Sequence, residues 1–200
     1  VFPFNLRNTA YLIRAWVNLP NDYNSLNDSI ITRITKATIT IGSFEDFESF
    51  TDGGCFPNGN GDMMKNGWED KSTGTSKWNV ENSDLCGNSS TIGPRFDHTS
   101  CSGNFLYADS PGATGEAILE STCVDFTNMT TAAMDFWYYR HGTNLGTLFI
   151  DVFDNVNWIN GVFTVTAEPQ IRNIDPWSLE RVSLSQFAGN NIKVRFRVLN

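Results

Sequence analysis

Residues 93–110, GPRFDHTSCSGNFLYADS, decide how the rest of the chain is interpreted. The stretch joins a turn-forming segment, Asp97-His98-Thr99, to a short apolar run, Gly103 to Asp109, with the composition of a β-strand. Asp and Thr side chains hydrogen-bond to nearby backbone N–H groups, and a histidine can pack its ring. We therefore expect Asp97-His98-Thr99 to be the turn that sets the register of the following strand, and not part of a catalytic site.

A series of strand-like segments follows, each separated from the next by turn residues. The segments are rich in β-branched and aromatic residues at alternating positions. They span Gly115 to Thr122, Ala132 to His141, Gly146 to Asp154, Val162 to Ala167, Trp177 to Leu184 and Asn191 to Val198. Spacing of this kind predicts an all-β fold, an antiparallel β-sandwich or jelly roll.

Two further strand-like runs, residues 11–17 and 30–41, lie near the start of the chain and flank a turn-rich polar loop. We expect them to form a hairpin, which must join a larger sheet because two strands alone are marginally stable in water. The composition changes after Gly42, where aromatic and acidic residues alternate from Phe44 to Phe50. We therefore divide the chain into residues 1–41 and 42–200.

Composition and charge argue against several functional classes. The formal net charge is -8 and the 14 Lys and Arg residues form no run, so a nucleic-acid surface is not expected. No apolar stretch approaches the roughly 18 to 20 residues that cross a bilayer, so membrane insertion is not expected either. With 13% aromatic and 18% charged residues, the mixture is common in extracellular β proteins, and we expect a secreted or cell-surface protein.

The sequence gives no support for catalysis. A hydrolase needs a nucleophile beside a base, and the two histidines, His98 and His141, stand in no Gly-x-Ser-x-Gly, His-Glu-x-x-His or Cys-His context. Carboxylate pairs for glycoside hydrolysis can be nominated in any acidic chain. We predict that the protein is not an enzyme.

The four cysteines favour disulfides over a zinc site, because none stands in a C-x-x-C pair. If residues 103–109 and 115–122 form a hairpin, Cys101 and Cys123 lie opposite each other and a disulfide between them is sensible. By elimination Cys55 would pair with Cys86 and clip the long loop between residues 51 and 67. Four cysteines allow three connectivities, so the other pairings stay open.

Alternation along the strand that begins at Ala132 separates two aromatic pairs. Phe136 and Tyr138 share one face, and Trp137 and Tyr139 share the other. One pair belongs to the core and the other can line a surface for sugar stacking or protein contact. The sequence leaves open which pair is inside, and Trp137 and Tyr139 are the candidate surface-binding residues.

From Phe47 to Val198 the chain resembles a MAM domain, an extracellular module named after meprin, a neuropilin-type antigen and a receptor tyrosine phosphatase. The matching residues occur in the family's order, as Phe47-Glu48, Trp78, Gly93-Pro94, Asp97-His98-Thr99, Gly103 to Asp109, Ala117 to Ser121, Met134 to Gly142, Gly146-Thr147-Leu148 and Trp177. Ser76-Lys77 and the long loop from Thr51 to Gly67 depart from the animal pattern and are similar to bacterial versions. The family continues beyond Arg197 into a last strand, so we expect residues 42–200 to lack that strand.

Residues 1 to about 40 resemble the closing hairpin of the Ig-like repeats of large bacterial surface proteins. Together the resemblances imply a jelly-roll β-sandwich preceded by the end of an Ig-like β-sandwich. They imply a non-catalytic adhesion or interaction module of a secreted, cell-surface protein, with other proteins, surface glycans or neighbouring Ig-like domains as partners. The alternatives are an accessory carbohydrate- or substrate-binding module of a secreted hydrolase or protease, and a structural spacer.

MAM domains resemble jelly-roll modules that hold a hard cation, usually calcium, where the first strand meets neighbouring loops. We expect Glu48, Asp97 and Asp109 to bind such a cation, because calcium prefers several carboxylate and carbonyl oxygens. The cation would fix strand ends and take no part in chemistry.

Overall fold

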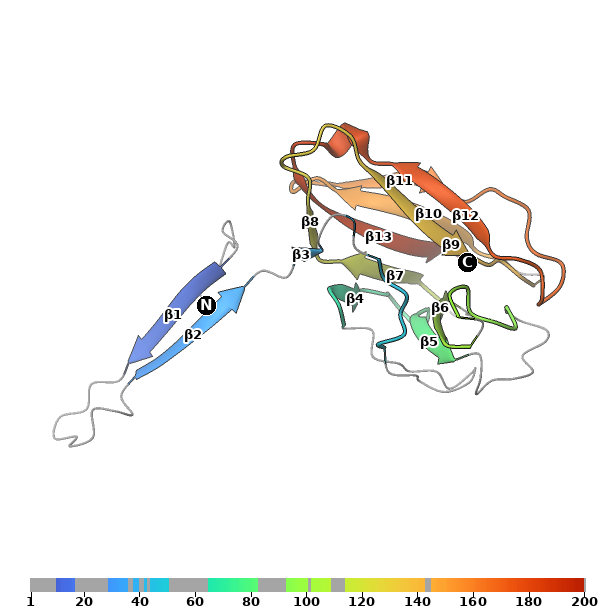
Figure 1. Ribbon diagram of the computed structural model, residues 1–200, viewed down its shortest axis with the longest axis horizontal. Coiled ribbons are helices and arrows are strands. Elements are labelled where there is room, and N and C mark those ends of the chain that lie inside the picture. The colour runs from blue at the N-terminus through green and yellow to red at the C-terminus, as the bar shows by residue number, and fades with distance from the viewer. Residues whose placement is uncertain are drawn as a thin grey trace. The chain divides into compact units, whose positions relative to one another are not determined.

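The fold is described from a computed structural model. The structure describes residues 10–16, 29–35, 38–39, 42, 44–50, 65–82, 93–100, 102–108, 114–142 and 145–199. The chain divides into two compact units, Val1–Ala37 and Thr38–Asn200 (Figure 1).

The first unit contains the predicted hairpin. β1 (Ala10–Trp16) and β2 (Ser29–Thr35) pair antiparallel along their whole length. The second unit begins at Thr38, where β3 (Thr38–Ile39) pairs in parallel with β8 (Cys123–Asp125). The division into domains after residue 41 stays a prediction. The Ig-like character of the hairpin stays a prediction.

The second unit is built on a seven-stranded sheet. Its main path runs β11–β10–β13–β7–β4, and β8 joins β13 and β3 beside it. All neighbours are antiparallel except β3 and β8. The five strands of the path are β4 (Trp68–Asp70), β7 (Glu116–Ser121), β10 (Thr147–Phe153), β11 (Trp158–Thr164) and β13 (Asn191–Leu199).

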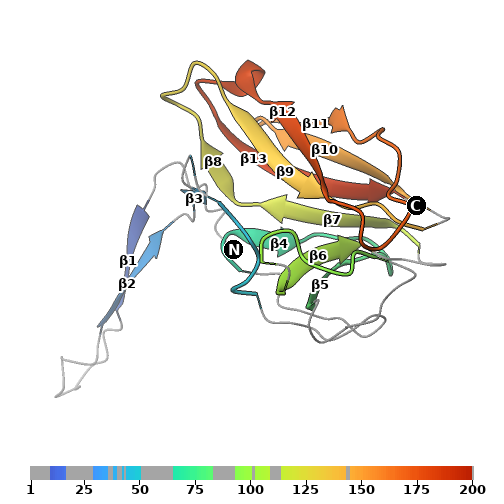
Figure 2. The same ribbon diagram turned by 45° about the vertical axis from the view of Figure 1, so that its right-hand side comes forward.

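Two antiparallel strand pairs form the second layer (Figures 1 and 2). One joins β5 (Trp78–Asn82) to β6 (Asn104–Ala108), and the other joins β9 (Ala133–Tyr138) to β12 (Ser178–Ser183), which is followed by the short 3-10 helix η1 (Ser185–Phe187). The predicted all-β, antiparallel β-sandwich is therefore confirmed.

The core lies between these layers because alternate residues of each strand point to the same side. Ile150 of β10 and Ile192 of β13 are fully buried in the same cluster as Val182 of β12. Leu119 of β7 packs with Val80 of β5 in a second cluster. Phe196 contacts both clusters and a third around Tyr138, so one side chain of β13 connects the whole core.

The predicted hairpin between residues 103–109 and 115–122 is wrong. β6 pairs with β5, whereas β7 pairs with β13 and β4, so the two segments belong to different layers. β7 is buried on both faces, as Ile118 and Leu119 show, which is the pattern of a central strand. Turn residues predict that a chain reverses direction, but they do not determine which strands pair.

Candidate functional site

Asp97 holds the turn of the 93–110 stretch. Its side chain is buried, and one carboxylate oxygen accepts hydrogen bonds from the backbone N–H groups of Thr99 (2.7 Å) and Ser100 (3.0 Å). The other oxygen accepts one from the Ser100 hydroxyl (3.2 Å). This is the turn-forming role that the sequence predicts.

The turn is fixed against the β9–β12 pair by aromatic contacts. The His98 ring stacks on Trp137 of β9 with 4.0 Å between centroids. The indole N–H of Trp177, just before β12, donates to the backbone oxygen of Phe96 (3.0 Å). Residues 93–100 therefore serve as a strap over the outer side of this strand pair.

The aromatic alternation of β9 places Trp137 on the outer side and Tyr138 in the core. The Trp137 side chain is 43% exposed, whereas Tyr138 is 6% exposed. Tyr139 shares the outer side, but its hydroxyl donates to the backbone oxygen of Arg172 and its ring packs on Trp177. Burial raises the pKa of Tyr139 above its usual value. Trp137 thus remains accessible, and Tyr139 supports the neighbouring loop.

Several exposed apolar side chains lie on the same elements as Trp137 or on segments joined to them. Five of the nine large hydrophobic side chains that are exposed in the described residues lie on the strap, on β9–β12 or on the loop before β12. We call this set the apolar surface; it consists of Phe96, Trp137, Ile171, Ile174 and Leu179. Such concentrations mark sites of protein interaction more often than single exposed residues do.

The loop that carries Ile171 and Ile174 is held by its own hydrogen bonds. The Asp175 carboxylate accepts from the backbone N–H groups of Ile171 (3.1 Å) and Arg172 (2.8 Å). The N–H of Arg95 on the strap donates to the backbone oxygen of Asn173 (2.7 Å), which joins strap and loop. The backbone that carries Ile171 and Ile174 is therefore hydrogen-bonded to the strap that carries Phe96.

An ion pair lies beside the apolar surface. Arg181 of β12 makes two hydrogen bonds to the carboxylate of Asp135 on β9, at 2.7 and 2.6 Å. Leu179 lies two residues from Arg181, directly across from Trp137. On the outer side of β9–β12, the apolar pair Trp137–Leu179 therefore lies next to the charged pair Asp135–Arg181.

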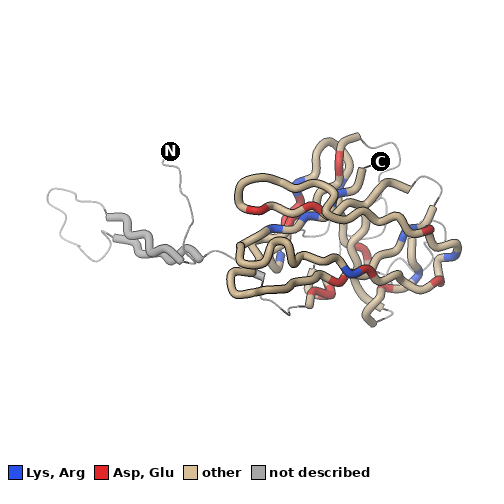
Figure 3. Tube along the Cα trace, turned by 90° about the horizontal axis from the view of Figure 1, so that it is seen from above, with Lys and Arg blue, Asp and Glu red and all other residues tan. Residues whose placement is uncertain are grey.

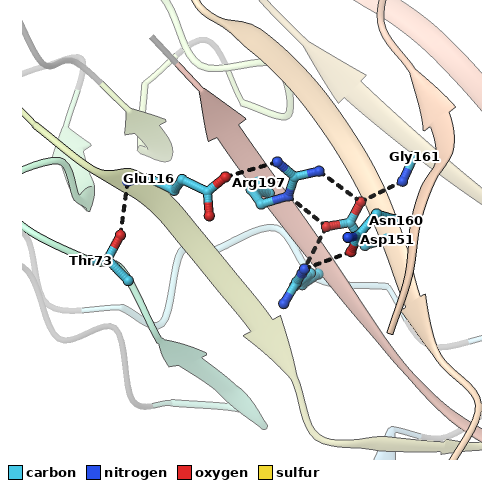
Figure 4. Close-up of polar contacts among 7 residues, drawn as sticks. Thr73, Glu116, Asp151, Asn160, Gly161 and Arg197 are labelled. Atoms are coloured by element: carbon cyan, nitrogen blue, oxygen red, sulfur yellow. Dashed lines mark hydrogen bonds and ion pairs between the residues drawn. The ribbon is translucent and has the colours of Figure 1, made fainter. Parts of the chain in front are cut away.

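The seven-stranded sheet has one face toward the second layer and one face away from it. The face away from the second layer carries a group of ion-paired side chains, which we call the charged ladder (Figure 4). It consists of Asp151 on β10, Arg195 and Arg197 on β13, and Glu116 on β7. Asp151 is fully buried and accepts from Nε of Arg195 (2.8 Å) and Nε of Arg197 (2.7 Å). The Arg197 guanidinium also reaches Glu116 at 2.9 Å.

The two arginines of the ladder balance the charges of its two carboxylates. Burial alone would raise the pKa of Asp151, but hydrogen bonds from Arg197, the Gly161 backbone and Arg195 hold that pKa below its usual value. The Gly161 N–H donates to Asp151 at a bulge of β11. The guanidinium of Arg195 also lies 4.1 Å from the centre of the Trp158 ring. We interpret the ladder as structural, because its charges satisfy one another.

Sequence reasoning missed the ladder, although a signal for it exists. Arg195 and Arg197 alternate with Val194 and Phe196, which places both arginines on one face of a strand. Asp151 stands between two apolar residues of another predicted strand. The missing information was that these strands are neighbours.

A family model for the MAM domain, meprin/A5/mu, matches residues 50–200, more than half of the chain. The chain belongs to the MAM domain family. It is also 32% identical to neuropilin-1a of Danio rerio over 118 residues, which cover 58% of this chain and 12% of that protein. The chain thus spans about an eighth of the curated relative that it matches. MAM domains are jelly-roll, non-catalytic modules of adhesion and protein interaction that occur in extracellular proteins.

Two of the three predicted cation ligands of this MAM domain are described, and each binds backbone donors. Asp97 holds its own turn, and Glu48 accepts from the N–H of Asn104 at 3.3 Å with both carboxylate oxygens. Asn104 donates in turn to the backbone oxygen of Phe50 (2.9 Å). Within the described ranges no three His, Cys, Asp or Glu side chains gather as a metal site. Asp109 lies outside those ranges, and the calcium site stays a prediction.

The disulfides of the MAM domain also stay predictions. Cys123 at the start of β8 is buried, and it has no disulfide partner among the described residues. Cys101, Cys55 and Cys86 lie outside them. The expected pairing of Cys101 with Cys123 depended on a hairpin that the structure contradicts.

Charge and hydropathy give no second candidate site. Over the described part of the chain Lys and Arg are interspersed with Asp and Glu (Figure 3). No helix in that part is long and apolar enough to span a bilayer. The apolar surface is thus the strongest candidate functional site of the MAM domain.

Proposed function

We propose that this MAM domain binds a partner protein through the apolar surface, as an adhesion or interaction module of a secreted, cell-surface bacterial protein that also contains Ig-like repeats. The observation that carries the proposal is the exposed side chain of Trp137, next to Leu179 and held in place by His98. Tryptophan on a preformed surface is the residue type that dominates many protein interfaces.

The test uses the whole 200-residue chain on an array of purified extracellular proteins. We expect Trp137→Ser and Leu179→Ser each to weaken binding about tenfold or more, as central interface residues do. Val156→Ser is the control, because Val156 is also an exposed apolar residue (76%) but lies at the turn between β10 and β11, outside the apolar surface. Binding that neither surface variant reduces would overturn the proposal.

The alternative function is an accessory module that binds carbohydrate for a secreted hydrolase or protease. It is favoured by one feature, the exposed Trp137 ring beside the polar Asp135–Arg181 pair, because sugars stack on aromatic rings and hydrogen-bond to charged groups. Binding of the chain to a glycan array, lost in Trp137→Ser, would support this alternative. A protease or glycosidase domain in the same reading frame would support it independently.

A further inference from the structure

We propose that the free edge of β12 accepts an extended segment of the partner protein as an additional antiparallel strand. The proposal rests on the proposed function, because it uses the same outer side of β9–β12. Among the described residues β12 pairs with β9 and with no other strand. Partners that add a strand to an exposed sheet edge gain main-chain hydrogen bonds.

The hydrogen-bond pattern shows which backbone groups of β12 face away from β9. Leu184 donates its N–H to the backbone oxygen of Ala132 (2.9 Å), which is the next position of the register after Ser183↔Ala133. Bonded and non-bonded pairs alternate along an antiparallel ladder. The N–H and C=O groups of Leu179, Arg181 and Ser183 therefore point to the open edge, and all three residues are exposed.

Two edge strands of the seven-stranded sheet are less suited to strand addition. β11, at one edge of the seven-stranded sheet, carries a bulge where Gly161 is held by Asp151, and bulges discourage pairing with a further strand. β4, at the other end of the main path, has three residues. β12 has six residues, no proline and no bulge.

The side chains of β12 define the partner. Directly opposite residues on one face of a sheet have Cβ atoms about 4.5–5.5 Å apart, so the partner residue beside Leu179 should be apolar. The residue beside Arg181 should be acidic, because that guanidinium remains largely exposed despite its pair with Asp135. In an antiparallel strand the acidic residue precedes the apolar one by two positions. The expected motif is acidic-x-apolar in an extended segment.

Amide hydrogen exchange of the whole chain, followed by NMR, tests this directly. The probe is the capped peptide Thr-Thr-Asp-Thr-Leu-Thr-Thr at about millimolar concentration. We expect the amides of Leu179, Arg181 and Ser183 to exchange quickly in the free chain and about tenfold or more slowly with the peptide. A peptide with Lys in place of Asp, and one N-methylated at Asp and Leu, should give little protection.

Ser183→Pro provides a second test, because it removes one edge-facing N–H and leaves the bonds to β9 in place. Ser183→Ala, which keeps that N–H, is the matched control. Protection that is lost in the first variant and kept in the second supports strand addition. If these three amides are already protected in the free chain, or if the peptide protects none of them, the edge proposal is wrong. If partner binding depends on Trp137 but does not protect the edge amides, the proposed function is supported and the edge proposal is wrong.

Discussion

The Asp151 carboxylate of β10 accepts a 2.7 Å hydrogen bond from Arg197 of β13 at a position completely shielded from solvent. Arg195, two residues earlier on the same strand, donates to the same oxygen. Two guanidinium groups thus compensate one buried charge, and Glu116 balances the second of them. Because the three strands involved are neighbours in the sheet, the ladder joins β10, β13 and β7 through side chains as well as backbone.

Replacing Asp151 with Asn should destabilise the domain strongly. The amide has nearly the same shape but cannot neutralise Arg195 and Arg197, and breaking a buried ion pair from one side costs about 3–5 kcal/mol. The free energy of unfolding from urea denaturation measures the effect. Asp135→Asn, which breaks the solvent-exposed pair with Arg181, should lower the free energy of unfolding much less, because water screens that pair. Equal losses in the two variants would contradict the structural role of the ladder.

Acid should destabilise the domain through the same carboxylate. The pKa of Asp151 in the folded chain is below its usual value, whereas in the unfolded chain it is about 3.9. The unfolded chain therefore binds the proton first as the pH falls, so this stabilisation is complete above about pH 5 and is lost at lower pH. Unfolding free energies measured from pH 7 to pH 3 should fall less steeply in Asp151→Asn. Parallel curves would show that other groups dominate.

Gly115 should tolerate alanine far less well than Gly189. Both have positive φ angles, 92° and 84°, so alanine is strained at either position. A Cβ at Gly115 would overlap the backbone oxygen of Thr73, whereas nothing lies within 4 Å of one at Gly189. We expect thermal or urea unfolding to show an additional loss of about 1–3 kcal/mol for Gly115→Ala. Similar losses at the two positions would mean that the backbone at Thr73 moves away from the added Cβ at little cost.

Calcium should raise the melting temperature of the chain relative to a chelator, if the predicted site is formed with Asp109. The increase should disappear in Asp109→Asn, because the described carboxylates of Glu48 and Asp97 already bind backbone N–H groups. Asp154→Asn serves as a control at the turn after β10, far along the sequence from all three predicted ligands. A melting temperature indifferent to calcium in the unsubstituted chain would contradict the predicted cation site.

The strands were predictable because alternation is a local property. Residues 133–138 lie within a segment expected from sequence, and residues 191–199 extend the expected segment 191–198 by one residue. The turn role of Asp97 followed from the chemistry of its side chain. The pairing of distant strands was not predictable. Asp151 is separated from Arg195 and Arg197 by 44 and 46 residues, and no local pattern connects them. The exposure of Trp137 was not predictable either, because it depends on which face of β9 packs against the seven-stranded sheet.

β13 also determines how the second unit would respond to being pulled. Thr38 of β3 pairs with Cys123 of β8. The next two residues of β8 pair with Asn191 and Ile192 at the start of β13. Leu199 lies at the far end of β13. A force applied between Thr38 and Leu199 therefore acts along β13. Its hydrogen bonds to β10 and β7 run perpendicular to the strand, so they would be strained together in shear and could not open one after another. This geometry suits a module that has to stay folded under tension.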